Sequence, residues 1–272
     1  VGDFDGDGRF DVLFSDNSRV YMRLGGPDAG TGSTYVAEHP QGWAIAGAGD
    51  VDGDGKADVF WHNGATGEPY VWFMAGQVVK GGLLGPRLPL GATPRMVGDF
   101  NGDQRADAMF ADNNQVRILL ASGNALTDTA VGPPPAGWGV VMERPTKRAA
   151  LIRADIDANG QSDVLLHNAA SGRITHWRMS GTTRTAVGPE LALPSGYTPR
   201  AQSDFNGDGR ADILLSNGAS LRMWLGNGDG TFTDTPAGSH SPGWSIVGAG
   251  DLNDDGKADV IWHNPSSGEV YY

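Results

Sequence analysis

A nine-residue acidic pattern recurs six times along this chain and constrains the fold more than any other feature. Its first copy runs Asp3-Phe4-Asp5-Gly6-Asp7-Gly8-Arg9-Phe10-Asp11, with aspartates at positions 1, 3, 5 and 9 and glycines at positions 4 and 6. Successive copies start 47, 49, 56, 49 and 47 residues apart, at Asp3, Asp50, Asp99, Asp155, Asp204 and Asp251. A period of this length, kept from end to end, indicates a repeat architecture.

The pattern also predicts metal binding. Oxygen ligands at alternate positions of a glycine-containing turn suit Ca²⁺, a hard cation that takes about six to eight oxygens. We expect side chains at positions 1, 3, 5 and 9, and the backbone carbonyl at position 7, to bind up to six structural Ca²⁺ ions. Position 12 is apolar in every copy, so the loops are not EF-hands, which carry a bidentate glutamate there. The predicted ligands are Asp3, Asp5, Asp7, Arg9 and Asp11 in loop one; Asp50, Asp52, Asp54, Lys56 and Asp58 in loop two; Asp99, Asn101, Asp103, Arg105 and Asp107 in loop three; Asp155, Asp157, Asn159, Gln161 and Asp163 in loop four; Asp204, Asn206, Asp208, Arg210 and Asp212 in loop five; and Asp251, Asn253, Asp255, Lys257 and Asp259 in loop six.

Two loops depart from the pattern. Loop three has Gln104 at position 6, and loop four has Ala158 at position 4 and Asn159 at position 5. A side chain strains a turn that favours glycine. We therefore expect these two loops to bind metal more weakly than loops one and two, which carry four aspartates each.

The segments between the loops read as short strands. In the second unit, they are Trp43–Gly49, Val59–His62, Tyr70–Met74 and a weaker strand near Gly82–Leu84. Four short strands in each unit predict an all-β fold, a β-propeller of four-stranded antiparallel blades. Six repeats are visible, and we expect six or seven blades when the ring is complete. We interpret residues 1–272 as a single propeller domain, truncated at both ends.

Blades alternate between two types. Blades two, four and six share a tryptophan at the start of the first strand and a His-Asn pair at the end of the second. We expect the repeated tryptophans to pack blade against blade and the His-Asn pairs to hold the following turn. A lectin with one site in each blade pair is the alternative. The residues concerned are Trp43, Trp138 and Trp244, and His62, His167 and His263.

Composition narrows the functional classes. The chain has no cysteine, which excludes disulfides and thiolate metal sites. Its net charge is −12 with 32 acidic residues, and most of the acidity lies in the loops, where bound Ca²⁺ would neutralise it. There is no basic stripe typical of nucleic-acid binding and no apolar run long enough to span a membrane.

The loops and their period resemble FG-GAP repeats, also called VCBS repeats, of bacterial secreted proteins and of integrin α subunits. Gly226-Asn227-Gly228-Asp229-Gly230-Thr231-Phe232 and Gly67-Glu68-Pro69-Tyr70-Val71-Trp72 are similar to the bacterial branch. The resemblance implies a propeller with calcium in the hairpin between the first two strands of each blade. It also implies partner binding on the opposite face in the integrin relatives. Because fold does not imply function, the ligand stays open.

We expect a calcium-stabilised extracellular module, secreted or on a bacterial cell surface, that binds a protein or a glycan without catalysis. No nucleophile elbow or phosphate loop is present, so we expect no enzyme activity. The alternatives are a multivalent lectin, an accessory propeller of a secreted polysaccharide-degrading enzyme, and a structural subunit of a surface assembly.

Blade four contains about ten residues more than blades two and six between its Gly-Trp tryptophan and its acidic loop. The excess is locally basic in an acidic chain. Insertions into a regular scaffold often carry function, so Arg144, Lys147 and Arg148 are candidate ligand-binding residues for an acidic partner. The alternative is a tolerated loop with no role.

Overall fold

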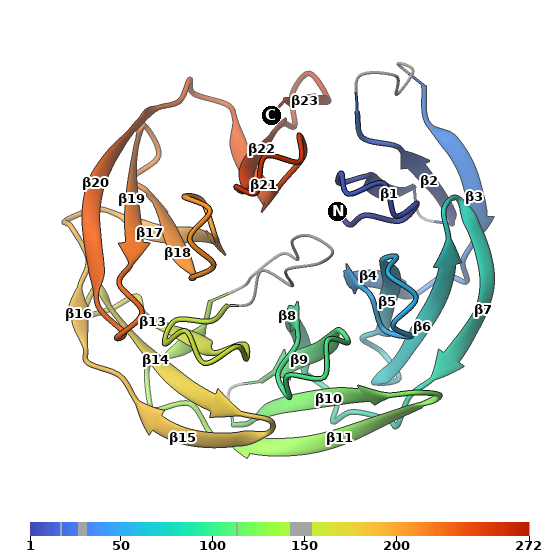
Figure 1. The fold of residues 1–272 in the computed structure, drawn as a ribbon, viewed down its shortest axis with the longest axis horizontal. Helices are drawn as coiled ribbons and strands as arrows, with labels where there is room; N and C mark the ends of the chain where they lie inside the picture. Colours follow the sequence, from blue (N-terminus) through green and yellow to red (C-terminus); the bar gives the residue numbers. More distant parts are fainter. Residues whose placement is uncertain (17, 27–31, 113, 142–153, 272) are drawn as a thin grey trace.

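The computed structural model describes residues 1–16, 18–26, 32–112, 114–141 and 154–271. These residues form strands and turns, and the strands assemble into six antiparallel sheets arranged as blades around an axis (Figure 1). The predicted all-β propeller is confirmed, and it has six blades. Within the described ranges, no helix is long and apolar enough to cross a membrane. The candidate residues Arg144, Lys147 and Arg148 lie outside the described residues.

The first three blades follow the chain in order, and blades two and three have the predicted four strands. Blade one has three, because only an isolated bridge between Gly2 and Asp11 stands where its first strand is expected. The strands are β1 (Val12–Asp16), β2 (Arg19–Arg23) and β3 (Thr34–Glu38); β4 (Trp43–Gly49), β5 (Asp58–Asn63), β6 (Glu68–Ala75) and β7 (Val78–Leu84); and β8 (Thr93–Gly98), β9 (Asp107–Ala111), β10 (Val116–Ser122) and β11 (Ala125–Gly132).

The last three blades differ more from one another. Blade five has four strands, and blade six has three among the described residues. Blade four has five, because the extra strand β16 pairs with β14 beyond the end of β15. The strands are β12 (Gly139–Val140), β13 (Val164–Asn168), β14 (Arg173–Ser180), β15 (Thr183–Val187) and β16 (Leu191–Ala192); β17 (Thr198–Ser203), β18 (Asp212–Ser216), β19 (Ser220–Gly226) and β20 (Phe232–Ser239); and β21 (Ser245–Gly250), β22 (Asp259–Asn264) and β23 (Glu269–Tyr271).

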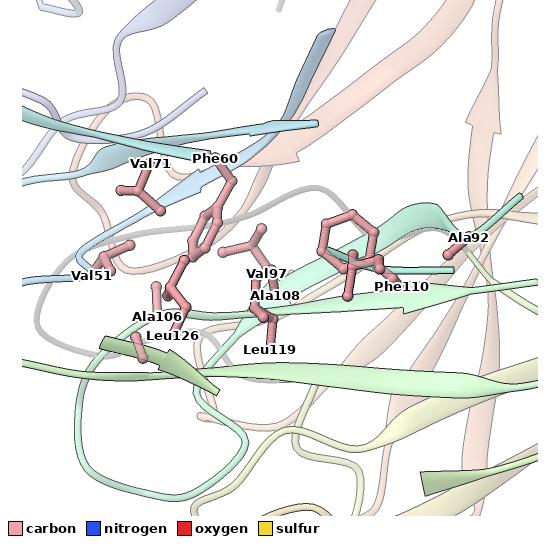
Figure 2. Packing of buried hydrophobic residues seen from close by; sticks show 12 residues of the cluster. Val51, Phe60, Val71, Ala92, Val97, Ala106, Ala108, Phe110, Leu119 and Leu126 are labelled. Carbon is pink, nitrogen blue, oxygen red and sulfur yellow. The ribbon is translucent and has the colours of Figure 1, made fainter. Parts of the chain in front are cut away.

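The hydrophobic core lies between the blades rather than at one centre. Successive strand residues point to opposite faces, so Val59 and Trp61 of β5 pack against blade one, whereas Phe60 packs against blade three. Figure 2 shows the cluster between blades two and three, where Phe60 lies near Val97 and Leu119. Both faces of β5 are therefore buried, which explains its continuous apolar run.

Blades six and one are also in contact, so the ring is closed at its inner end. Phe10 of the first acidic loop is 1% exposed and packs against Leu252 and Ile261 of blade six. A Cβ atom at Gly250 would overlap Cε2 of Phe10, so the ring of Phe10 fills the place of a side chain there. The two ends of the chain consequently lie near each other in Figure 1.

Candidate functional site

The acidic loops sit at the inner ends of the blades, around the axis of the ring (Figure 1). In blades two, three, five and six, the loop connects the innermost strand to the next strand, as loop two does between β4 and β5. This is the hairpin position that the sequence predicts. The repeat thus brings the acidic residues of all six blades to one ring of loops.

The position-1 aspartate organises the turn of its own loop. In loop one, Oδ1 of Asp3 accepts a hydrogen bond from the Gly6 amide at 2.6 Å, and Oδ2 accepts one from the Gly8 amide at 3.0 Å. Gly6 and Gly8 have φ angles of 82° and 93°, in the left-handed region that glycine adopts without steric cost. The carboxylate and the two glycines therefore define one local structure, which recurs in the other loops.

Among the described residues, three that are not glycine adopt the same left-handed backbone. They are Gln104 with φ 69°, Ala158 with φ 61° and Asp254 with φ 66°. The first two are the departures noted in the sequence, so the conformational demand at positions 4 and 6 persists where glycine is absent. The third, at position 4 of loop six, is a departure that the sequence analysis missed, although aspartate tolerates this region better than alanine does.

The position-9 aspartate ties its loop to the rest of the blade. In loop two, Oδ2 of Asp58 accepts a hydrogen bond from the Val51 amide at 2.9 Å, and Oδ1 accepts one from the Met74 amide in the third strand at 2.8 Å. Asp58 is 0% exposed. The same pair of bonds occurs at Asp11, Asp107, Asp163 and Asp212. This structural role was not predicted.

Three loops bring carboxylate oxygens from positions 1, 3 and 9 to within 4.8 Å of one another. The position-5 aspartates are not part of these groups. Loops three, five and six have asparagine at position 3 instead, which offers an amide oxygen in place of a carboxylate. The three carboxylate groups are Asp3, Asp5 and Asp11; Asp50, Asp52 and Asp58; and Asp155, Asp157 and Asp163.

Burial makes these carboxylates costly to ionise without a cation. Desolvation raises the pKa of Asp58 and Asp163 to about 7 and the pKa of Asp107 to about 8, and neighbouring loop carboxylates act in the same direction. The donor set contains only oxygen atoms, which is the chemistry that Ca²⁺ prefers. The residues of these loops therefore fit a bound divalent cation, whose charge would favour the ionised carboxylates.

Among the described residues, three loops have a basic side chain beside their acids. In loop five it is the loop's own Arg210, whose Nη1 lies 3.8 Å from Oδ2 of Asp208, and in loops two and four it comes from a strand. Nζ of Lys80, from β7, lies 2.9 Å from Oδ2 of Asp52 and also contacts Asp54 in loop two. Nε of Arg178, from β14, lies 3.8 Å from Oδ2 of Asp157 in loop four. Each of these basic side chains neutralises part of the negative charge that would otherwise attract a metal ion.

Neighbouring loops are also bonded to each other. The position-8 amide of one loop donates to the position-1 carbonyl of the preceding loop, as from Ala57 to Asp3 at 2.7 Å and from Ala106 to Asp50 at 2.6 Å. Nζ of Lys56, at position 7, donates to the carbonyl of Asp5 at 2.8 Å. Hydrogen bonds therefore join each of these loops directly to the preceding one.

The repeated aromatic and histidine residues have separate roles. Trp43, Trp61 and Trp138 belong to the clusters between blades, as expected for packing. In the His-Asn pairs, asparagine holds the turn, because Oδ1 of Asn63 accepts from the amides of Ala65 and Thr66. His62 instead packs edge-on against Phe110 of blade three, with ring centroids 5.2 Å apart. The turn-holding role predicted for the His-Asn pair is therefore carried by its asparagine.

Residues 3–61 and 204–262 match the profile of the FG-GAP-like repeat. The two matched segments have the same length and begin 201 residues apart, so blades five and six repeat blades one and two without insertion or deletion. No curated protein sequence matches the chain.

Solved structures show the same fold at low sequence identity. A lectin from Agrocybe aegerita is 16% identical with a TM-score of 0.63, over 100% of this chain and 77% of the lectin. The Tc holotoxin pore of Photorhabdus luminescens is 15% identical with a TM-score of 0.61, over 98% of this chain but only 13% of the toxin chain. An oligogalacturonate lyase is 11% identical with a TM-score of 0.53, over 98% of this chain and 74% of the lyase.

Proposed function

Since the chain is a β-propeller built from FG-GAP-like repeats, we propose that it is a calcium-stabilised, non-catalytic binding module that works outside the cell. The observation that carries the metal part is the convergence of positions 1, 3 and 9 in the acidic loops. Asp3, Asp5 and Asp11 would hold the ion in loop one, and the corresponding residues would do so in the others. The ion supplies positive charge that offsets the repulsion among buried carboxylates.

The proposed binding role, as opposed to catalysis, follows from the structural role of the acidic residues. The acidic residues converge in loops that hold turns and strands together, so they serve the scaffold rather than a reaction. The folds of both a lectin and a lyase are similar to this one, so the fold itself does not decide the class.

The Agrocybe aegerita lectin recognises non-reducing terminal N-acetylglucosamine. A glycan is therefore the ligand class that we favour over a protein partner, and the module could serve alone or beside a catalytic domain. An extracellular setting suits loops of this kind, because sites of modest affinity fill in millimolar calcium.

The loops are not expected to bind calcium equally. Loop one combines four aspartates with glycine at positions 4 and 6, and no basic side chain forms an ion pair with its carboxylates among the described residues, since the ammonium of Lys56 donates to the backbone carbonyl of Asp5 instead. Loop two has the same acids, but Lys80 neutralises part of their charge. Loop four has Arg178 near Asp157 and a strained Ala158. We propose that loop one binds most tightly and loop four least.

Thermal melting with and without calcium tests the proposal. Metal that binds only the folded state adds about 2.7 kcal/mol per site at a hundredfold excess over Kd. We expect Tm in millimolar Ca²⁺ to exceed Tm in EDTA by several degrees, with a smaller increase in Mg²⁺, which prefers a tighter octahedral site. Overlapping curves in Ca²⁺ and EDTA would contradict a structural role for calcium.

A further inference from the structure

Six asparagines in the chain are followed by glycine, and asparagine is a chemically labile residue. In such a pair, the backbone nitrogen of the glycine can attack Cγ of the asparagine and release ammonia. Water then opens the resulting succinimide to aspartate or isoaspartate. Glycine favours this reaction because it has no Cβ to hinder the attacking nitrogen. The six pairs are Asn63-Gly64, Asn101-Gly102, Asn159-Gly160, Asn206-Gly207, Asn217-Gly218 and Asn227-Gly228.

Four of these pairs are locked by a hydrogen bond from the glycine amide. In the acidic loops the acceptor is the position-1 carboxylate, as where the Gly102 amide donates to Oδ1 of Asp99 at 2.6 Å. The equivalent bonds in loops four and five are 2.7 Å long. The Gly218 amide donates to Oγ of Ser216 at 3.0 Å. An amide held in this way must break its bond before it can lose its proton and attack, so the fold protects these four asparagines.

The amides of Gly64 and Gly228 donate no hydrogen bond among the residues that the structure describes. Their asparagines are held differently. Oδ1 of Asn63 accepts from two backbone amides of its own turn, at 3.0 and 3.2 Å, which fixes the side chain. Asn227 is exposed in the hairpin between β19 and β20, and its side chain bonds to threonine hydroxyls. Asn227-Gly228 therefore combines a free nucleophile with an accessible amide group.

The two threonines orient the Asn227 side chain for attack. Oγ1 of Thr233 donates to Oδ1 of Asn227 at 3.0 Å. Negative charge develops on this oxygen when Cγ is attacked, and a donor already in place lowers the barrier. The leaving nitrogen, Nδ2, donates to Oγ1 of Thr231 at 2.9 Å. The hairpin therefore polarises the carbonyl group that the Gly228 nitrogen must reach.

A guanidinium group lies beside the attacking residue. A Cβ at Gly228 would come within 2.8 Å of Nε and 3.2 Å of Cζ of Arg210, so this side chain packs directly on the glycine. Its positive charge stabilises the negative charge that forms as the Gly228 amide loses its proton. At Gly64, in contrast, a Cβ would meet no atom within 4 Å. The guanidinium thus distinguishes the two unlocked pairs.

The geometry points to a self-modification site at Asn227-Gly228, where asparagine is converted to aspartate and isoaspartate without an enzyme. A bond forms between N of Gly228 and Cγ of Asn227, the Cγ–Nδ2 bond breaks, and ammonia leaves with the amide proton. Water adds to either carbonyl of the succinimide and opens the ring. The product places a new negative charge beside Asp229, whose carbonyl accepts from Nη2 of Arg178 in blade four at 2.7 Å. The modification therefore falls at the junction of blades four and five.

Peptide mapping by mass spectrometry tests the inference on the calcium-loaded chain, incubated at mildly alkaline pH. We expect Asn227 to react at least tenfold faster than the four locked asparagines and several-fold faster than Asn63, and to give both aspartate and isoaspartate. In urea with EDTA, where the chain is unfolded, the six pairs should react at similar rates. Equal rates in the folded chain, or a faster reaction at another pair, overturn the inference. A preference for Asn227 that persists in urea also overturns it, because the fold would then not select the site.

Two variants test the activating groups. Thr233→Val removes the donor to Oδ1, and Arg210→Met removes the guanidinium. Each should slow the reaction at Asn227 at least threefold, leave the rate at Asn63 unchanged, and melt within a few degrees of the unaltered chain. Thr235→Val is the matched control, because Thr235 lies on the same strand and donates to a backbone carbonyl of β19, so its rate should not change. An unchanged or faster reaction at Asn227 in both test variants would contradict the proposed activation.

Discussion

At the scale of single residues, Gln104 and Ala158 bear the conformational cost of the repeat. Both hold a left-handed backbone that side chains rarely adopt, at a cost of about 1–3 kcal/mol. Their loops keep the hydrogen bonds of the pattern, since Asp99 accepts from the Gln104 amide at 2.9 Å and Asp155 accepts from the Gly160 amide at 2.7 Å. The surrounding bonds therefore impose the strain.

We predict that Gln104→Gly and Ala158→Gly each raise the free energy of unfolding by about 1 kcal/mol, because glycine removes the strain while its greater freedom in the unfolded chain offsets part of the gain. Gly209→Ala is the matched control. Gly209 occupies position 6 of loop five with φ 84°, and a Cβ there meets no atom within 4 Å, so the change isolates the backbone effect. It should destabilise by a similar amount. Urea denaturation in EDTA measures all three, and a loss of stability in either glycine variant would contradict the strain argument.

The sequence predicts strain at positions 4 and 6 because each loop can be compared with five others inside the same chain. It does not predict the partner of a buried side chain. The aromatic contact between His62 and Phe110 joins blades two and three, and nothing in the local pattern His-Asn specifies that neighbour. The asparagine role follows from local turn chemistry, whereas the histidine role depends on packing between blades.

At the scale of the element, the position-9 aspartate does more than offer a metal ligand. Asp107 is 0% exposed and accepts from the amides of Phe100 and Ala121 at 2.9 and 2.8 Å. It therefore bonds the acidic loop to the third strand of the blade. Asp103, at position 5 of the same loop, is exposed and bonds only within the loop.

This contrast separates the structural and metal contributions. Asp107→Ala leaves two buried amides without partners, at about 1–3 kcal/mol each, so we predict a lower free energy of unfolding both in EDTA and in Ca²⁺. Asp103→Ala should change stability in EDTA by less than about 1 kcal/mol, because it breaks only exposed bonds. It should also reduce the increment that calcium adds, because the sequence predicts position 5 as a further ligand beside positions 1, 3 and 9. Denaturation of both variants with and without calcium is the measurement. Equal losses from the two variants in EDTA would show that the position-9 bonds do not hold the loop.

The strands themselves were largely predictable. The first strand of blade two runs Trp43–Gly49 as expected, and the second and third extend the expected ranges by one or two residues at each end. Alternation within β5 assigns its faces, but it does not reveal which blade each face meets. The two-residue strand β16 pairs with Arg173 and Ile174 of β14, and sequence periodicity does not mark so short a strand.

At the scale of the whole molecule, the ring depends on small residues that let blades approach. A Cβ at Gly49 would lie 2.6 Å from that of Ala106, and a Cβ at Gly2 would lie 2.7 Å from that of Ala57. The glycine before each of these loops therefore leaves room for the alanine at position 8 of the next loop. The sequence shows both residues recurring, but their contact joins different repeats and becomes visible only when the ring is assembled.

At the junction of blades six and one, position 8 is Phe10 instead of alanine. The ring of Phe10 fills the space beside Gly250. We predict that Phe10→Ala lowers the free energy of unfolding by about 3–5 kcal/mol through the cavity that it leaves. Gly250→Ala places a Cβ against Cε2 of Phe10 and should cost about 1–3 kcal/mol by overpacking. In the double variant, the methyl group at position 250 occupies part of the space that the ring of Phe10 leaves. The loss of stability should therefore be at least about 1 kcal/mol smaller than the sum of the losses in the two single variants. Urea denaturation of the four chains gives this coupling energy, and simple additivity would mean that Phe10 and Gly250 do not close the ring together.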